Sequence, residues 1–134
     1  MKSRKIIAGV DEVGRGSLIG SVYSAAVILP ANGFSLELRD SKKLTGRSRI
    51  KIANSLVKES ISISIGIATK DEIDSINIHH ATLLSMRRAV YNLVIEPDLV
   101  LIDGLYKPEV ELDCECIVKG DNKVEEISAA SIIA

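Results

Sequence analysis

The sequence predicts an α/β fold in which helices flank a mixed β-sheet. Two continuously apolar runs, residues 6–10 and 99–102, are typical of strands that are buried on both faces. Two further strand patterns follow the first run and predict an antiparallel meander. A long helical stripe then precedes the second apolar run, which favours a crossover helix and a parallel strand beside the first.

The first three strands come early in the chain. The apolar run Ile6–Val10 ends at Asp11, and Val22–Leu29 is the second strand. The third, residues 61–67, alternates isoleucine with serine or glycine and is expected to be half-buried.

Helical spacing of apolar residues follows. A first helix is predicted from Ile50, Ala53 and Val57. The second and longest helix carries a stripe that we assign to the core: Ile76, His79, Leu83, Met86, Val90 and Leu93. This helix leads into the strand that ends at Asp103, so Asp11 and Asp103 are expected at the same edge of the sheet.

The last part of the chain predicts a short strand over Glu115–Val118, a turn over Lys119–Asn122, and a helix from about Val124. Apolar residues continue to Ala134 with no glycine cap, basic last turn or following proline. We therefore expect the chain to end inside a helix.

Composition excludes several classes of protein. With 134 residues, 46% of them hydrophobic and 26% charged, the chain fits one globular domain, residues 1–134. The net charge of −1 provides no overall attraction to a polyanion, so any such binding must be local. Aromatic residues make up 3%, which disfavours a single-strand binder built on stacked bases.

The early apolar run is too short for a signal peptide or a membrane span, so we expect a cytoplasmic protein with no membrane partner. We also expect the protein to act as a monomer. Cys114 and Cys116 lie two residues apart on an expected strand, and no zinc quartet accompanies them. They are interpreted as reduced structural thiols.

Three acids are the candidate catalytic and metal-binding residues: Asp11, Glu12 and Asp103. Carboxylates clustered at strand ends are costly unless solvated or neutralised, and Mg²⁺ prefers such oxygen ligands. The cluster predicts phosphoryl or phosphodiester chemistry. Asp11 and Glu12 can converge only if the backbone bends after Asp11. The alternative is that these acids are solvated strand caps.

Two segments could contact a phosphate. Gly14, Arg15 and Gly16 can form a loop whose backbone approaches a ligand closely, although such a tripeptide is also an ordinary turn. Lys42 and Lys43 begin a basic patch before the first helix, or else a solvated helix face.

The tandem histidines invite a metal or acid–base interpretation. His79 lies on the apolar stripe and His80 does not, so we favour a packing histidine and a surface neighbour.

Six separated segments together resemble ribonuclease HII, in order and spacing, and the bacterial type in particular. They are 9–16 (Gly-Val-Asp-Glu-Val-Gly-Arg-Gly), 40–44 (Asp-Ser-Lys-Lys-Leu), 77–82 (Asn-Ile, then Ala-Thr), 101–104 (Leu-Ile-Asp-Gly), 119–121 (Lys-Gly-Asp) and 129–134 (Ala-Ala-Ser-Ile-Ile-Ala).

The resemblance implies a ribonuclease H-like fold with a mixed five-stranded sheet and flanking helices. It implies a Mg²⁺- or Mn²⁺-dependent endonuclease that cuts the RNA strand of RNA·DNA hybrids, and ribonucleotides embedded in duplex DNA, leaving 3′-hydroxyl and 5′-phosphate ends. Asp11, Glu12 and Asp103 would hold the metal ions. The loop Gly14–Arg15–Gly16 would sense the ribose 2′-hydroxyl, and Lys42 and Lys43 would contact phosphates.

The same resemblance implies an Arg-Asp pair beyond Ala134 that supplies a fourth active-site carboxylate, followed by further helices. The chain is therefore expected to lack the family's C-terminal part and to turn over feebly. The alternative is a non-catalytic fragment that keeps the fold and weak hybrid or metal binding.

Overall fold

The computed structural model describes residues 6–13, 20–30 and 46–134. Within these ranges the strands and helices follow one another along the chain as β1 (Ile7–Val13), β2 (Val22–Ile28), α1 (Gly46–Glu59), β3 (Ser62–Ala68), α2 (Lys70–Asn92), β4 (Leu99–Asp103), β5 (Cys114–Ile117), the 3₁₀ turn η2 (Gly120–Asn122) and α3 (Glu125–Ile133).

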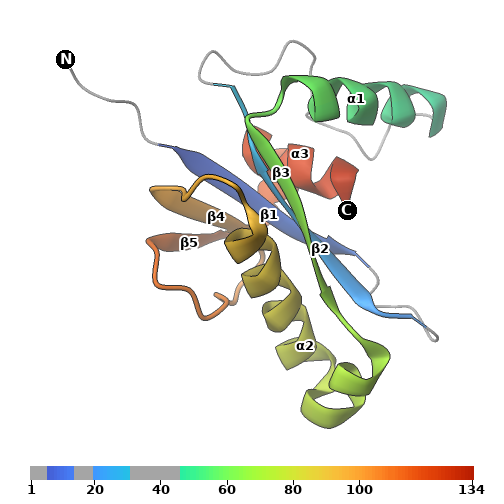
Figure 1. The fold of residues 1–134 in the computed structure, drawn as a ribbon, viewed down its shortest axis with the longest axis vertical. Coiled ribbons are helices and arrows are strands. Elements are labelled where there is room, and N and C mark those ends of the chain that lie inside the picture. Colours follow the sequence, from blue (N-terminus) through green and yellow to red (C-terminus); the bar gives the residue numbers. More distant parts are fainter. Residues whose placement is uncertain (1–5, 14–19, 31–45) are drawn as a thin grey trace.

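The five strands form one mixed sheet in the order β3-β2-β1-β4-β5. The pairs β1·β2 and β2·β3 are antiparallel, whereas β1·β4 and β4·β5 are parallel. The predicted meander and the parallel strand delivered by a crossover helix are both confirmed. Figure 1 shows α2 in front of the sheet and α1 and α3 behind it.

Each face of the sheet has its own hydrophobic core. Val10, Ala26 and Ile102 pack on one face against Met86 and Val90 of α2. The other face carries Ala25, Val27 and Leu29, which pack against α1 and α3. Because β1 and β4 are covered on both sides, their sequences are continuously apolar, as predicted.

The buried side of β3 is the side of its small residues. Ser62, Ser64, Gly66 and Ala68 are buried, while Ile65 and Ile67 remain exposed. A Cβ on Gly66 would overlap the backbone of α2, so the helix lies very close to the strand. At this distance the Ser64 hydroxyl donates to the Ala89 carbonyl. The predicted alternation is confirmed. Because α2 packs so closely on β3, only the small residues of the strand fit on the buried side.

The apolar stripe predicted for α1 was wrong, because the helix turns a different face toward the core. Ile50 and Val57 are 64% and 66% exposed. Ile52 and Leu56 are buried instead, with Ala53 beside them. Residues 52 and 56 are also four apart, so the spacing alone cannot distinguish the two faces.

Helix α2 contains a sharp kink at Asn77, whose φ of 71° and ψ of 168° lie outside the helical region. The Asn77 side chain accepts a hydrogen bond from the backbone N–H of His80 at 3.0 Å and so caps the segment that follows. Glu72 and Arg88 are 16 residues apart, which in a straight helix corresponds to roughly 24 Å. Their side chains nevertheless meet at 2.6 Å, so the first segment is folded back toward the second.

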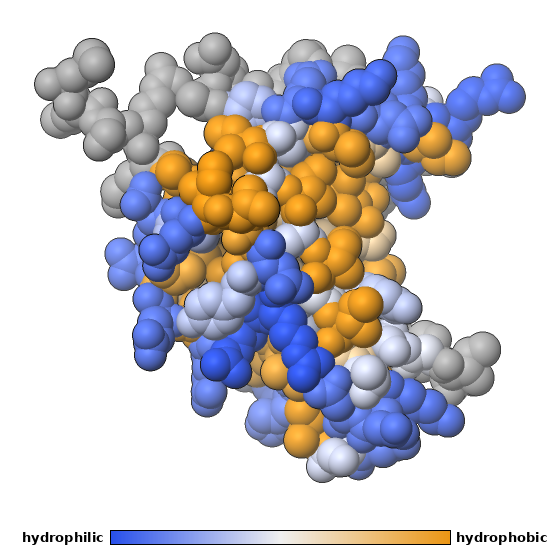
Figure 2. Space-filling model, in the orientation of Figure 1, coloured by the Kyte–Doolittle hydropathy of each residue, from blue (hydrophilic) through white to orange (hydrophobic). Residues whose placement is uncertain are grey.

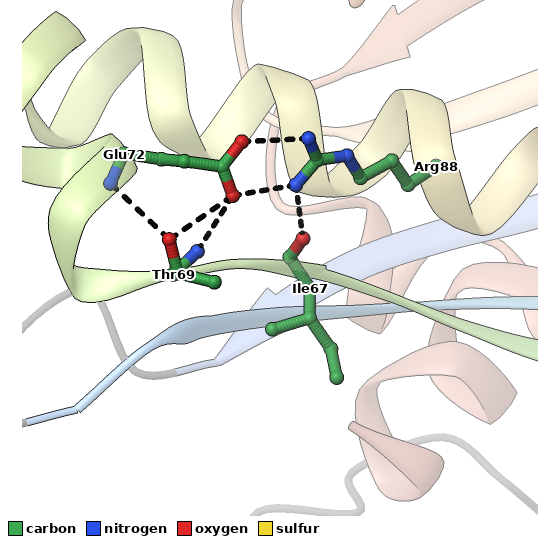
Figure 3. Close-up of polar contacts among 4 residues, drawn as sticks. All are labelled: Ile67, Thr69, Glu72 and Arg88. Atoms are coloured by element: carbon green, nitrogen blue, oxygen red, sulfur yellow. Dashed lines mark hydrogen bonds and ion pairs between the residues drawn. The ribbon is translucent and has the colours of Figure 1, made fainter.

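The ion pair between Glu72 and Arg88 fixes the start of α2 to the end of β3 (Figure 3). Arg88 donates to both carboxylate oxygens of Glu72 and to the Ile67 carbonyl, while Glu72 and Thr69 form a capping box. Asn92 donates in the same way to the Ile65 carbonyl. Two carbonyls of the edge strand β3 thus have partners from α2, which limits pairing with another chain.

The substitution Arg88→Gln is expected to lower the melting temperature at pH 7. The hydrogen bond from Arg88 lowers the pKa of Glu72 to about 2, so the pair stabilises the fold above the ordinary Glu pKa and is lost as the pH falls toward 2. The difference in melting temperature between variant and wild type should therefore shrink between pH 5 and pH 2.5. Arg87→Gln is the matched control, because Arg87 lies over the Tyr91 ring instead. A difference independent of pH would contradict this account.

The surface carries a band of hydrophobic side chains (Figure 2). Ile65 and Ile67 of β3 are among the exposed large hydrophobic residues. Every helix in the described part of the chain is too short or too polar to cross a membrane.

Candidate active site

The ends of β1 and β4 bring two of the predicted acids together. The strands are parallel neighbours, with Val10 opposite Ile102, so Asp11 and Asp103 follow at the same level of the sheet. A carboxylate oxygen of Asp11, one of Asp103 and one of a third acid all lie within 4.8 Å of one another. The shared sheet edge expected from the two apolar runs is confirmed.

A third acid, Asp121, completes this group, which we call the acid cluster (Asp11, Asp103 and Asp121). Asp121 lies in η2, between β5 and α3, and is 5% exposed. Its local sequence predicts no role for it, although the Lys119-Gly120-Asp121 segment is part of the resemblance. The resemblance implies a further active-site carboxylate beyond Ala134, and within the described residues Asp121 already adds an acid to Asp11 and Asp103.

Several contacts hold the turn that carries Asp121. The Gly120 N–H donates to Asp103 Oδ1 at 2.7 Å, and the Ser128 hydroxyl donates to the Asp121 carbonyl. A Cβ on Gly120 would lie 2.5 Å from Ile127 Cδ1, so α3 packs directly on the turn. Lys119 enters it in the left-handed conformation, with φ of 55°. These contacts depend on the placement of α3 and have no local sequence signal.

The acid cluster is electrostatically strained. Asp11 is 6% exposed. Its pKa is raised to about 8, first because burial penalises the ionised form and second because the Asp103 carboxylate lies nearby. The Glu12 N–H donates to Asp11 Oδ1 at 2.8 Å and partly offsets this effect. A cation bound among these carboxylates would relieve their repulsion.

Glu12 does not join the acid cluster. The backbone bend after Asp11 that convergence with Glu12 would require is absent from β1, which pairs with β2 without interruption through Val13. Alternation along β1 places Glu12 on the face of Val10 and α2, but its carboxylate still approaches Asp11 closely enough to raise the pKa of that acid. Glu12 and Asp103 instead line a cavity of about 130 Å³ together with His79 and Tyr106. Asp103 is thus common to the acid cluster and to this cavity.

The other predicted contacts with substrate lie outside the described residues. They are Gly14, Arg15 and Gly16 of the glycine loop, and Lys42 and Lys43 of the basic patch.

The histidines and cysteines lie as expected. His79 is half-buried and packs edge-to-face on Tyr106, with ring centroids 4.6 Å apart, while His80 is exposed. Cys114 and Cys116 are free thiols that pack on the core beneath α2, and burial raises the pKa of both.

A family model described as Ribonuclease HII matches residues 8–134. Among solved structures, ribonuclease H2 from Pyrococcus horikoshii is 27% identical with a TM-score of 0.83, and the match covers 96% of this chain and 69% of that one. RNase HII of Archaeoglobus fulgidus, solved in complex with PCNA, is 24% identical with a TM-score of 0.77, covering 96% and 70%.

The fold is also shared with Bst-RNase HIII, solved in complex with Mn²⁺, at 22% identity and a TM-score of 0.81. That match covers 97% of this chain and 50% of the other. The expected ribonuclease H-like fold is confirmed by these similarities.

Proposed function

The chain belongs to the ribonuclease HII family, whose model spans residues 8–134, and from this premise we propose that it is a metal-dependent endoribonuclease that cuts the RNA strand of RNA·DNA hybrids. Family membership supports nuclease activity. The proposal extends it to cleavage at ribonucleotides embedded in duplex DNA, with 3′-hydroxyl and 5′-phosphate products.

The observation that carries the proposal is the acid cluster at the ends of β1 and β4. Its donors are all carboxylate oxygens, which suit Mg²⁺ or Mn²⁺ and do not favour softer metals. The raised pKa of Asp11 reflects its burial and the nearby Asp103 carboxylate, whose negative charge a bound cation would offset. We propose that Asp11, Asp103 and Asp121 bind the metal directly, with Glu12 contributing from the adjoining cavity.

Divalent ions bound there would supply Lewis-acid stabilisation of charge on the phosphodiester and lower the pKa of water. Backbone N–H groups of this chain hold the metal-binding carboxylates in place: Asp103 is oriented by the Gly120 N–H, and Asp11 by the Glu12 N–H. In the overall reaction water adds to phosphorus and the P–O3′ bond breaks. The RNA strand thereby acquires a 3′-hydroxyl on one side and a 5′-phosphate on the other.

The remaining substrate contacts are proposed from the sequence. The loop Gly14–Arg15–Gly16 would approach the ribose 2′-hydroxyl, and Lys42 and Lys43 would bind backbone phosphates. We further propose that the protein acts as a monomer in the cytoplasm, where its two free thiols would stay reduced.

Cleavage of three end-labelled duplexes tests the function: an RNA·DNA hybrid, a DNA duplex with one ribonucleotide, and an all-DNA duplex. We expect Mg²⁺- or Mn²⁺-dependent cleavage of the first two, abolished by EDTA. Binding without cleavage would favour the non-catalytic alternative, and equal cutting of all-DNA would contradict the proposed substrate.

The substitution Gly16→Ala is expected to reduce the preference for the single-ribonucleotide duplex over all-DNA by about 10-fold, because a Cβ would block close backbone approach. Competition binding with the two duplexes measures the preference. Gly46→Ala is a matched control, since a Cβ there meets no atom within 4 Å. An unchanged preference in Gly16→Ala would remove the 2′-hydroxyl role of the loop.

A further inference from the structure

The chain turns sharply directly after Asp103. Gly104 has a φ of 121°, a conformation that favours glycine. Leu105 and Tyr106 follow it with 70% and 59% of their surfaces exposed. Two large apolar side chains are therefore displayed beside the acid cluster, where they contribute little to the core.

The ring of Tyr106 is nevertheless held in position. His79 of α2 packs edge-to-face against it, with ring centroids 4.6 Å apart and an interplanar angle of 84°. His79 is in turn packed against the ring of His80 at 5.2 Å. An exposed ring fixed along one edge presents a preorganised apolar surface to a partner.

The cavity of about 130 Å³ connects this surface with the acids, because Glu12, Asp103, His79 and Tyr106 all line it. Leu83 is shared with a second cavity of about 690 Å³, which also contains Arg87 and Lys107. This second cavity adjoins the first at Leu83, and the acids Asp74 and Glu109 line it beside the two cations.

We propose that Tyr106 is a substrate-contacting residue on which a sugar ring of the nucleic-acid backbone packs, next to the phosphate at the acid cluster, with His79 as its positioning residue. The proposal rests on the proposed function. In a duplex the bases are stacked inside, so a protein surface meets chiefly sugars and phosphates. The apolar ring of Tyr106 is suited to the sugar, and it carries no positive charge that would hold a phosphate.

Tyr106→Ala is expected to weaken binding of a fluorescently labelled RNA·DNA hybrid by roughly 10-fold, measured by anisotropy in Ca²⁺. Tyr106→Phe, which keeps the ring, should bind within about twofold of wild type. His79→Ala should give an intermediate loss, and His79→Phe should restore binding. Tyr91→Ala is the matched control, since Tyr91 is 50% exposed near the other end of α2.

The dependence of affinity on salt distinguishes a sugar contact from a phosphate contact. Loss of a phosphate contact lowers the slope of log K against log salt by about one, while Tyr106→Ala should leave the slope unchanged. A second measurement uses the absence of tryptophan from the sequence: with Tyr23 and Tyr91 changed to Phe, the emission of Tyr106 should respond to hybrid binding.

The outcomes separate this proposal from the function on which it rests. Failure of the wild-type chain to bind any hybrid would overturn both. Normal binding by Tyr106→Ala, or an emission of Tyr106 that does not respond to the hybrid, would overturn only the sugar contact. Equal losses in Tyr106→Phe and Tyr106→Ala, or a reduced salt slope, would likewise exclude the ring as the contact surface.

Discussion

Replacing Asp103 by asparagine should abolish Mn²⁺ binding measured by calorimetry and reduce cleavage of an RNA·DNA hybrid by more than about 100-fold. Loss of a residue that only orients a metal ligand costs about 10- to 100-fold, and a direct ligand should cost more. Asp103 is the acid common to the acid cluster and to the cavity that contains Glu12. Its removal therefore affects both parts of the site.

The asparagine variant is well suited to separate binding from folding. Its side-chain oxygen can still accept the hydrogen bond from the Gly120 N–H, so η2 should remain in place. Asp121→Asn should show a similar loss, because Asp121 belongs to the same cluster. Asp113→Asn, at an exposed position before β5, is the control and should bind Mn²⁺ normally. Unchanged Mn²⁺ binding by Asp103→Asn would show that the acid cluster is not the metal site.

The sequence was sufficient to predict the pairing of Asp11 with Asp103 for a specific physical reason. Each aspartate ends a continuously apolar run, and the intervening long helix requires the second run to return parallel to the first. Parallel neighbours place their carboxyl ends together. Local patterns therefore determine this part of the site without knowledge of any tertiary contact.

The other parts depend on contacts between distant segments. Asp121 enters the acid cluster because α3 packs on Gly120 through Ile127, and no periodicity in residues 119–123 predicts that contact. Glu12 lies on the α2 face because β1 continues to pair with β2 through Val13, without a bend after Asp11. The buried serines Ser24 of β2 and Ser64 of β3 have a similar origin, since their hydroxyls find partners only once α2 is in place.

The metal-free protein is expected to lose stability as the pH rises from about 5 to about 8, and Asp11→Asn should remove most of this loss. The pKa of Asp11 is about 8 in the fold, against 3.8 for an ordinary aspartate. Between these values the folded state holds a proton that the unfolded state has released, so each pH unit lowers the stability of the fold by up to about 1.4 kcal/mol. Urea unfolding at pH 5, 6.5 and 8 in EDTA measures the effect.

The informative quantity is the difference in the free energy of unfolding between wild type and Asp11→Asn, because the contributions of other groups cancel in it. Glu126, whose pKa is also raised by burial, is one such group. At pH 8 the asparagine variant should be the more stable of the two in EDTA, since it buries no charge. Added Mn²⁺ should reverse the order, because the cation stabilises the ionised cluster of the wild type and has lost a ligand in the variant. Equal stabilities at pH 8 without metal would contradict the burial cost of Asp11. A reversal that fails to appear with Mn²⁺ would instead exclude Asp11 as a ligand.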